Sequence, residues 1–281
     1  MRFRSYIPRA PLSELVEDFW LYEDYVGDHV RETILPSGTF ELVFNLREDE
    51  LRIYGPSDPA QCRSFRGAII SGPYAGSFMS DAAEEREILG VHFRPSGAFP
   101  MFGLPASDFT NTHVELRAVW GPAATTLRDR LCAAREPMER FALVEQALLA
   151  RLSHSRRRHP AVRAGLDMLV GARGGATVRD IAEAVDLSRR RFIDVFAAEV
   201  GMTPKVFGRV QRFQLAVASS RVPAKPDWSQ LAVGCGYFDQ SHLIRDFLEF
   251  CGATPSEFQR RRNLLASTGI HTKRNHLPVV G

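Results

Sequence analysis

Two similar stretches of the C-terminal half decide the fold: IAEAVDLSRRRFIDVF at residues 181–196 and LAVGCGYFDQSHLIRDF at residues 231–247. Apolar residues of the first stretch match those of the second at an offset of 50 before a central turn and of 51 after it. Each copy leads into the same exit, GMTP at 201–204 and GATP at 252–255. The one-residue difference falls in the turn, where an insertion costs least. The C-terminal half is therefore an internal duplication.

Each copy has the anatomy of a helix-turn-helix motif. A small residue, Ala182 or Ala232, stands where two short helices must approach closely. The turn comes at Asp186 or Gly236, residue types that tolerate the left-handed backbone of a sharp turn. Any pair of amphipathic helices could give one such copy, but two copies with matching turn, core and exit positions favour a duplicated motif. The second helices are expected to bury apolar pairs four residues apart: Phe192 with Phe196, and Leu243 with Phe247.

Side chains that cap helix N-termini precede the expected helices. These residues are Thr177 and Ser188 in the first copy, Asp227 and Asp239 in the second, and the capping-box pair Thr254 and Glu257 at the exit. Between the copies, residues 205–220 predict one helix of about 23 Å. Its apolar face consists of Val206, Val210, Phe213 and Val217. With the width of the motifs added, the two second helices come near the ~34 Å of one DNA turn.

Residues from about 161 to 262 resemble the DNA-binding domain of the AraC/XylS family of transcription regulators, including GYFDQSHLIRDF at 236–247 and GATPSEF at 252–258. The N-terminal half resembles uncharacterised sensor domains of such regulators, through YIPRAPL at 6–12, ILPSGTFELVFN at 34–45 and GVHFRPSGA at 90–98. The resemblance implies a sequence-specific regulator that is not an enzyme. Its implied partners are promoter DNA, RNA polymerase, a small-molecule effector at the N-terminal domain and a second copy of the chain. No cofactor or metal is expected.

In helix-turn-helix proteins the second helix enters the major groove and its outward residues meet base edges. In the first copy these candidates are Arg189, Arg190, Arg191, Ile193 and Asp194. Arg190 suits a guanine, whereas Asp194 either accepts from a cytosine amine or only holds Arg190 or Arg191 in place. Family members often carry longer polar or basic residues at the positions of Ile193 and Asp194, so the base preference of this helix stays open.

In the second copy the groove candidates are Gln240, Ser241, His242, Ile244 and Arg245. Gln suits adenine and Arg suits guanine. Four further arginines are candidates for phosphate contacts, with a solvated face as the alternative: Arg209, Arg212, Arg221 and Arg261. The neighbours of Arg261 in the run 260–262 are interpreted in the same way.

Charge is divided unevenly between the halves. Residues 1–150 hold 15 Lys and Arg against 22 Asp and Glu, and residues 151–281 hold 21 against 11. A basic half beside an acidic half suggests that only one part faces a polyanion. The prediction is an N-terminal sensor or partner domain at 1–154, a DNA-binding domain at 155–265 with motifs at about 177–196 and 228–247, and a mobile tail at 266–281.

The first half is punctuated by Pro and Gly and carries short β-rich runs, which predict an antiparallel sheet or small barrel. The expected strands are 33–35, 40–46, 51–54, 67–70 and 87–93, and helices are expected at 127–134 and 138–152. The fold class is therefore α+β, with a barrel-like (cupin-like) N-terminal domain and an all-α C-terminal domain in which a long helix joins two helix-turn-helix motifs. Six phenylalanines line an apolar pocket or form the core: Phe40, Phe44, Phe65, Phe78, Phe93 and Phe99.

Other chemistries find little support in the sequence. His29, His92 and His113 lack the spacing of a metal site, and Cys62, Cys132, Cys235 and Cys251 form no C-x-x-C pair. No apolar run approaches the ~20 residues of a membrane span. We therefore expect a cytoplasmic, nucleoid-associated protein without a membrane partner. Two alternatives stay open: a DNA-repair or other enzyme fused to this DNA-binding domain, which requires an activated cysteine, and a non-specific nucleoid protein.

Overall fold

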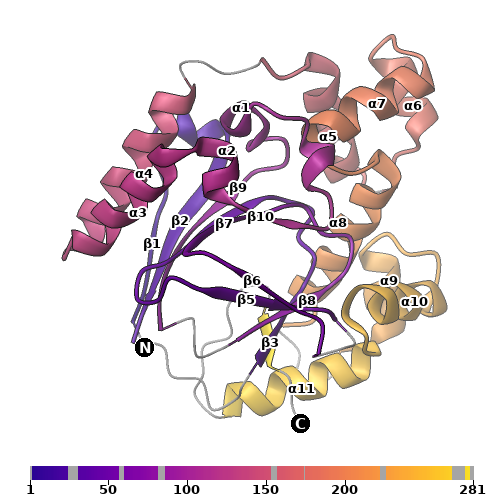
Figure 1. The fold of residues 1–281 in the computed structure, drawn as a ribbon. Helices are drawn as coiled ribbons and strands as arrows, with labels where there is room; N and C mark the ends of the chain where they lie inside the picture. Colours follow the sequence, from indigo (N-terminus) through magenta and orange to yellow (C-terminus); the bar gives the residue numbers. More distant parts are fainter. Residues whose placement is uncertain are drawn as a thin grey trace.

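The computed structural model describes residues 2–24, 31–56, 60–81, 86–152, 157–173, 175–221, 226–267 and 276–278. Strands fill the first part of the chain and helices the second (Figure 1). None of the helices within these ranges is long and apolar enough to cross a membrane.

The strands form two antiparallel sheets. The first sheet has the order β1 (Arg2–Tyr6), β2 (Val16–Glu23), β9 (Glu87–Phe93), β4 (Glu41–Asn45), β7 (Ala68–Ser71) and β10 (His113–Glu115). The second has the order β11 (His276–Pro278), β3 (Arg31–Ile34), β8 (Phe78–Asp81), β5 (Leu51–Tyr54) and β6 (Cys62–Phe65). All five expected strands are present, with small differences at their ends, whereas β1, β2, β6, β8, β10 and β11 were not predicted.

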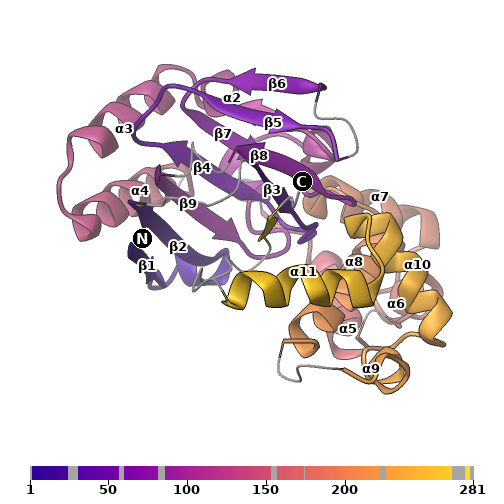
Figure 2. The ribbon, with the colours of Figure 1, turned by 90° about the horizontal axis from the view of Figure 1, so that it is seen from below.

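The sheets face each other across a small apolar core, and helices cover the outer face of the first sheet (Figure 2). These helices are α1 (Phe99–Phe102), α2 (Leu116–Trp120), α3 (Pro122–Ala133) and α4 (Pro137–Leu152), and the short 3₁₀ turns η1 (Leu12–Glu14) and η3 (Ala106–Phe109) lie on the same side. The α+β class and the antiparallel N-terminal domain are thus confirmed. The described pairings join the strands into two sheets and not into one continuous ring.

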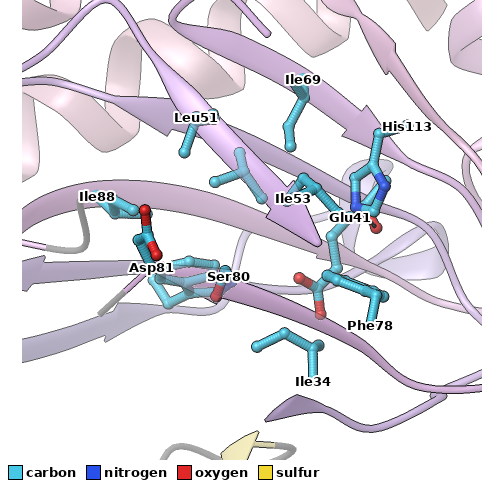
Figure 3. Close-up of a pocket in the computed structure, with 13 residues that line it drawn as sticks. Ile34, Glu41, Leu51, Ile53, Ile69, Phe78, Ser80, Asp81, Ile88 and His113 are labelled. Carbon is cyan, nitrogen blue, oxygen red and sulfur yellow. Dashed lines mark hydrogen bonds between the residues drawn. The ribbon is translucent and has the colours of Figure 1, made fainter. Parts of the chain in front are cut away.

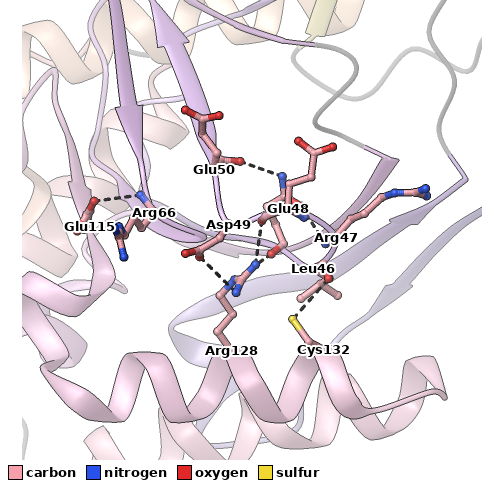
Figure 4. A network of polar contacts seen from close by, with 10 residues as sticks. Leu46, Arg47, Glu48, Asp49, Glu50, Arg66, Glu115, Arg128 and Cys132 are labelled. Atoms are coloured by element: carbon pink, nitrogen blue, oxygen red, sulfur yellow. Dashed lines mark hydrogen bonds and ion pairs between the residues drawn. The ribbon is translucent and has the colours of Figure 1, made fainter.

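A polar network ties α3 to the turn between β4 and β5 (Figure 4). The Arg128 side chain donates from Nε to the Asn45 carbonyl at 3.0 Å and from Nη2 to the Glu48 carbonyl at 2.8 Å, and it pairs with Asp49 at 3.3 Å. The Cys132 thiol, one turn further along α3, donates to the Leu46 carbonyl at 3.4 Å. Arg128 and Cys132 therefore hold a covering helix in place.

The C-terminal half is helical, as predicted. It consists of α5 (Pro160–Gly171), α6 (Val178–Ala184), α7 (Arg189–Val200), α8 (Pro204–Ser219), α9 (Trp228–Gly234), α10 (Gln240–Cys251) and α11 (Pro255–Ser267). The expected link at 205–220 is α8, which runs between the pair α6 and α7 and the pair α9 and α10 (Figure 1). One apolar cluster unites all of these elements, so the two motifs share a core.

Of the expected mobile tail at 266–281, the structure describes residues 266–267 and 276–278. Helix α11 continues to Ser267, and residues 276–278 form β11, which pairs with β3. Leu277 is buried and belongs to the apolar cluster of the helical half, together with Leu35. The sequence did not predict the strand at 276–278, because its pairing partner β3 lies more than 200 residues earlier in the chain. The expected boundary at 154–155 falls in residues 153–156, outside the described ranges.

The two halves are in direct contact. From α8, the amide nitrogen of Gln211 donates to the Ser37 carbonyl at 3.3 Å, and that of Gln214 donates to the Pro36 carbonyl at 2.6 Å. The Thr110 hydroxyl, just after η3, donates to the carbonyl of Gly201, at the end of α7. The connection between β3 and β4 therefore fixes the helix that joins the two motifs.

Candidate DNA-binding surface

The first motif folds as its sequence predicts. The Thr177 hydroxyl accepts the Asp180 amide at 3.2 Å and begins α6, and the Ser188 hydroxyl accepts the Arg191 amide at 3.2 Å and begins α7. Between them Asp186 has the left-handed φ of 53° that the turn requires. These local interactions set the angle between the two helices.

The buried face of α7 is made by Phe192 and Phe196, whose ring centroids are 5.6 Å apart. Helix α5 approaches this face so closely that a Cβ on Gly165 would lie 2.6 Å from the Phe192 ring. With one face of α7 fixed in the core, its opposite face is turned to solvent.

That opposite face carries the predicted groove residues. Arg189, Arg190, Arg191 and Asp194 are exposed, and Ile193 is half-buried. No hydrogen bond or ion pair involves the three guanidinium groups within the described ranges, and no ion pair joins Asp194 to Arg190 or Arg191 there. The alternative in which Asp194 only positions an arginine is therefore not seen. Three uncompensated positive charges lie at the first turn of α7.

The second motif repeats this construction with different residues. The Asp227 carboxylate accepts the amides of Ser229 and Gln230 at 2.9 and 3.1 Å and begins α9. The Asp239 carboxylate accepts the His242 amide at 2.7 Å and begins α10. Gly236 occupies the turn with a φ of 85°.

An aromatic cluster buries the inner face of α10. Phe213 of α8 packs edge-on against Phe247 and Phe250 at 5.0 and 5.2 Å, and Trp228 and Phe258 lie against Phe247 at 5.9 and 5.5 Å. The long helix thus supplies part of the core of the second motif. Leu243 is buried in the same cluster, as predicted.

The predicted groove residues of α10 lie on its other side. Gln240, Ser241 and Arg245 are exposed, and His242 and Ile244 are half-buried. The Gln240 carboxamide accepts the Ser229 hydroxyl at 2.8 Å, and the Arg245 Nε donates to the Ser241 carbonyl at 3.3 Å. The His242 ring meets Tyr237 edge-on at 5.2 Å. Both second helices, here called the readers α7 and α10, therefore expose polar residues in their first two turns.

Arg209 does not fit the phosphate role that we expected. Its guanidinium donates to the Asp246 carboxylate at 2.7 and 3.2 Å and to both Glu249 oxygens at 2.9 and 2.6 Å. The hydrogen bonds to Glu249 and Asp246 raise the pKa of Arg209 further above its usual value, despite partial burial. Arg209 therefore clamps α8 to α10. Sequence could not reveal this, because the partners lie 37 and 40 residues away.

Of the other candidate arginines, some are exposed and some make contacts within the helical half. Arg221 and Arg261 are exposed, whereas Arg212 is half-buried and lies over the Tyr237 ring at 5.6 Å. Arg262 was interpreted like Arg261, but it donates to the Ser220 carbonyl at 2.6 Å and to the Val217 carbonyl at 3.3 Å. It thereby satisfies carbonyls at the end of α8, where a cation is favoured.

A cavity of about 60 Å³ lies between the two sheets of the N-terminal half (Figure 3). Its lining is mainly apolar, aliphatic and aromatic, and it also includes the polar side chains of Glu41, Asp81 and His113. Desolvation and the nearby Arg63 charge lower the pKa of His113 to about 3, so its ring is neutral. The Trp20 indole also lines the cavity, and its buried N–H has no hydrogen-bond partner among the described residues. Of the six phenylalanines expected to form a pocket or a core, only Phe78 lines this cavity.

A second cavity, of about 160 Å³, lies where the first sheet meets α8. Glu41 borders both cavities, and Gln211 and Gln214 border the second one. His92 bridges Asp18 and Glu41 at 2.8 and 2.9 Å. Burial lowers the pKa of His92, but the Glu41 and Asp18 carboxylates outweigh this effect and raise it to about 10. His92 is thus an ion-paired imidazolium, and no cluster with the makeup of a metal site occurs among the described residues, which do not include His29.

Three of the described thiols, those of Cys132, Cys235 and Cys251, lack the lowered pKa that the alternative DNA-repair enzyme would need. Burial raises the pKa of Cys132, and it raises that of Cys251 to about 11. Reactive cysteines require the opposite shift.

Comparison with known families agrees with this geometry. Residues 181–261 match a family described as a helix-turn-helix domain, and residues 4–115 match a domain family of unknown function, DUF6597. Residues 181–261 are thus a helix-turn-helix domain, which is the class of domain that the two capped helix pairs indicate.

No curated protein matches the sequence. Among solved structures, the chain is similar to ToxT from Vibrio cholerae, with 8% identity, a TM-score of 0.47, and coverage of 92% of this chain and 98% of that one. It is likewise similar to ToxT from Vibrio cholerae O395, with 10% identity, a TM-score of 0.45 and coverage of 92% and 97%. The chain is also similar to unsaturated fatty acid bound wild-type ToxT from Vibrio cholerae strain SCE256. Here the identity is 8%, the TM-score is 0.45, and the match covers 96% of this chain and 98% of that one.

Proposed function

We propose that this protein binds specific promoter DNA by placing the readers α7 and α10 in two successive major grooves, and that its N-terminal half modulates this binding. The observation that carries the proposal is the shared design of the two readers. Each holds its apolar face in one common core and exposes polar residues in its first two turns, the part of a helix-turn-helix that meets bases.

The length of α8, which lies between the readers, supports a two-groove arrangement. Helix α8 has 16 residues, which corresponds to about 24 Å. The Arg209 clamp and the Phe213 contacts join this helix rigidly to α10. With the width of the two motifs added, this length would bring the readers near the ~34 Å that separates successive major grooves on one side of a duplex.

The test is selection of duplexes from a random library by the full chain, followed by affinity measurement over a range of salt concentrations. We expect the selected duplex to bind at least about 10³-fold more tightly than random DNA at physiological salt. Arg190→Ala and Arg245→Ala should each relax preference at one or two base pairs. Arg163→Ala is the control, since Arg163 is an exposed arginine of α5 outside both readers. Equal affinity for all duplexes would favour the non-specific nucleoid protein.

For modulation, we propose a small effector in the cavity between the sheets. Its volume of about 60 Å³ has room for about four to six water-sized groups. The buried Trp20 N–H has no partner among the described residues and calls for an acceptor. The two cavity carboxylates are already ion-paired, Glu41 with His92 and Asp81 with Arg31 and Arg52, so neither calls for a charged ligand. The effector class is therefore a small, mainly apolar, neutral molecule that carries a hydrogen-bond acceptor. Glu41 and the β3–β4 connection provide the path from this cavity to α8.

Thermal unfolding of the full chain with isobutanol, isobutylamine or isobutyrate tests this proposal. These three probes share one carbon skeleton and differ in head-group charge. We expect stabilisation by the neutral probe, whose hydroxyl oxygen can accept from the Trp20 N–H, and its loss in Trp20→Phe, which keeps an aromatic ring without the N–H donor. Stabilisation by isobutyrate alone would contradict the proposed effector class.

A further inference from the structure

The turns of the two motifs are equivalent except for one inserted residue. The Leu187 amide donates to the Ala182 carbonyl at 3.0 Å, and the Tyr237 amide donates to the Ala232 carbonyl at 2.9 Å. Leu187 and Tyr237 therefore occupy the same place, each just after the left-handed turn residue.

In the first motif the N-cap Ser188 follows Leu187 directly. In the second motif Phe238 stands between Tyr237 and the N-cap Asp239. Phe238 is thus the insertion that changes the offset between the repeats from 50 to 51.

Phe238 has no packing role within the motif. It is 90% exposed, whereas its neighbour Tyr237 is 4% exposed and fills the core position. Asp239 turns its carboxylate back to cap α10 through the His242 amide. The insertion therefore places a large apolar side chain in solvent immediately before the first residues of a reader.

We propose that Phe238 reads a thymine through its 5-methyl group in the major groove entered by α10. This rests on the proposed function, in which the N-terminal residues of α10 contact base edges. Apolar side chains distinguish thymine by contact with its methyl group, which the other bases lack. Because the first motif has no counterpart of Phe238, this recognition is confined to the half of the site that α10 contacts.

The probes are the duplexes that the full chain selects from a random library, with each thymine replaced in turn by uracil, which differs only by the missing methyl group. We expect one thymine in the α10 half-site at which uracil weakens wild-type binding about fourfold, as for one lost methyl contact. Phe238→Ala should bind the parent duplex about tenfold more weakly and should not distinguish thymine from uracil there. Phe238→Leu should retain part of the uracil penalty.

Val170→Ala is the control, because Val170 is an exposed apolar residue of the same domain on α5, away from both readers. Circular dichroism melting should give equal midpoints for all variants, since Phe238 contributes nothing to the core. Wild-type affinity in Phe238→Ala would overturn the inference, as would a uracil penalty that persists in that variant. If no duplex is enriched at all, the proposed function itself fails, which is a different outcome from enrichment without a uracil effect.

Discussion

Replacement of Arg209 by leucine should destabilise the helical half without removing a DNA contact. The change leaves the Asp246 carboxylate, which is 1% exposed, without the Arg209 guanidinium that pairs with it at 2.7 Å. The ion pair between Arg209 and Glu249 contributes less to stability than the pair with Asp246. The Glu249 side chain is 55% exposed, and such exposed pairs contribute about 0–1 kcal/mol.

The magnitude follows from breaking a buried pair on one side, which costs about 3–5 kcal/mol. The Arg209 side chain is 25% exposed, so water reaches the pair and the lower end applies, about 3 kcal/mol. For a unit of about 100 residues, the size of the helical half, the unfolding temperature of that half should fall by about 12 °C or more. Addition of Asp246→Asn, which removes the stranded charge, should restore most of the loss.

The assay is calorimetry of the full chain for the single variants and the double variant, together with DNA affinity over a range of salt concentrations. A phosphate contact would behave differently: its loss would lower the slope of log K against log salt by about 1 and leave the unfolding temperature unchanged. A lower salt slope with an unchanged unfolding temperature in Arg209→Leu would refute the conclusion that Arg209 holds α8 against α10.

Three further predictions follow from other contacts. His92→Gln should remove a pH dependence of the free energy of unfolding, because the folded His92 pKa of about 10 exceeds the unfolded value of about 6.5. The stabilisation by His92 is complete below pH 6.5 and falls by at most about 1.4 kcal/mol per pH unit as the pH rises to 10. Urea unfolding of both proteins over this pH range would measure the difference. Gly165→Ala should lower the free energy of unfolding by about 1–3 kcal/mol, because its Cβ would lie 2.6 Å from the Phe192 ring. In the control Gly171→Ala, on the same helix, the Cβ meets nothing within 4 Å, so this change should be neutral or stabilising. Equal melting temperatures of the two variants would contradict this prediction. Gln211→Ala combined with Gln214→Ala removes two hydrogen bonds of about 1 kcal/mol each between the halves and should speed amide exchange in the β3–β4 connection, unlike the exposed Gln230→Ala; unchanged exchange would show that these bonds do not hold α8.

The sequence alone determined what depends on neighbours along the chain. Helix caps act over two or three residues, turns need one left-handed residue, and an amphipathic face repeats every three or four, so both motifs and the linking helix could be located closely. The same reasoning found five strands with β-rich composition. It missed β2, whose VEDFWLYE has no clear alternation because both faces of this strand are buried. Trp20 and Tyr22 face the second sheet, and Leu21 faces the helices that cover the first.

Only the tertiary structure decided which polar side chains are exposed and which are paired within the fold. Arg190 and Arg209 are the same residue type on adjacent helices, yet the first faces solvent and the second is paired with Asp246. The partner of a long charged side chain is set by packing between helices distant in the chain, which no local pattern records. Three further features depend on contacts between distant segments and were seen only in the folded chain. They are the cavity between the sheets, the position of Glu41 on the border of both cavities, and the pairing of residues 276–278 with β3.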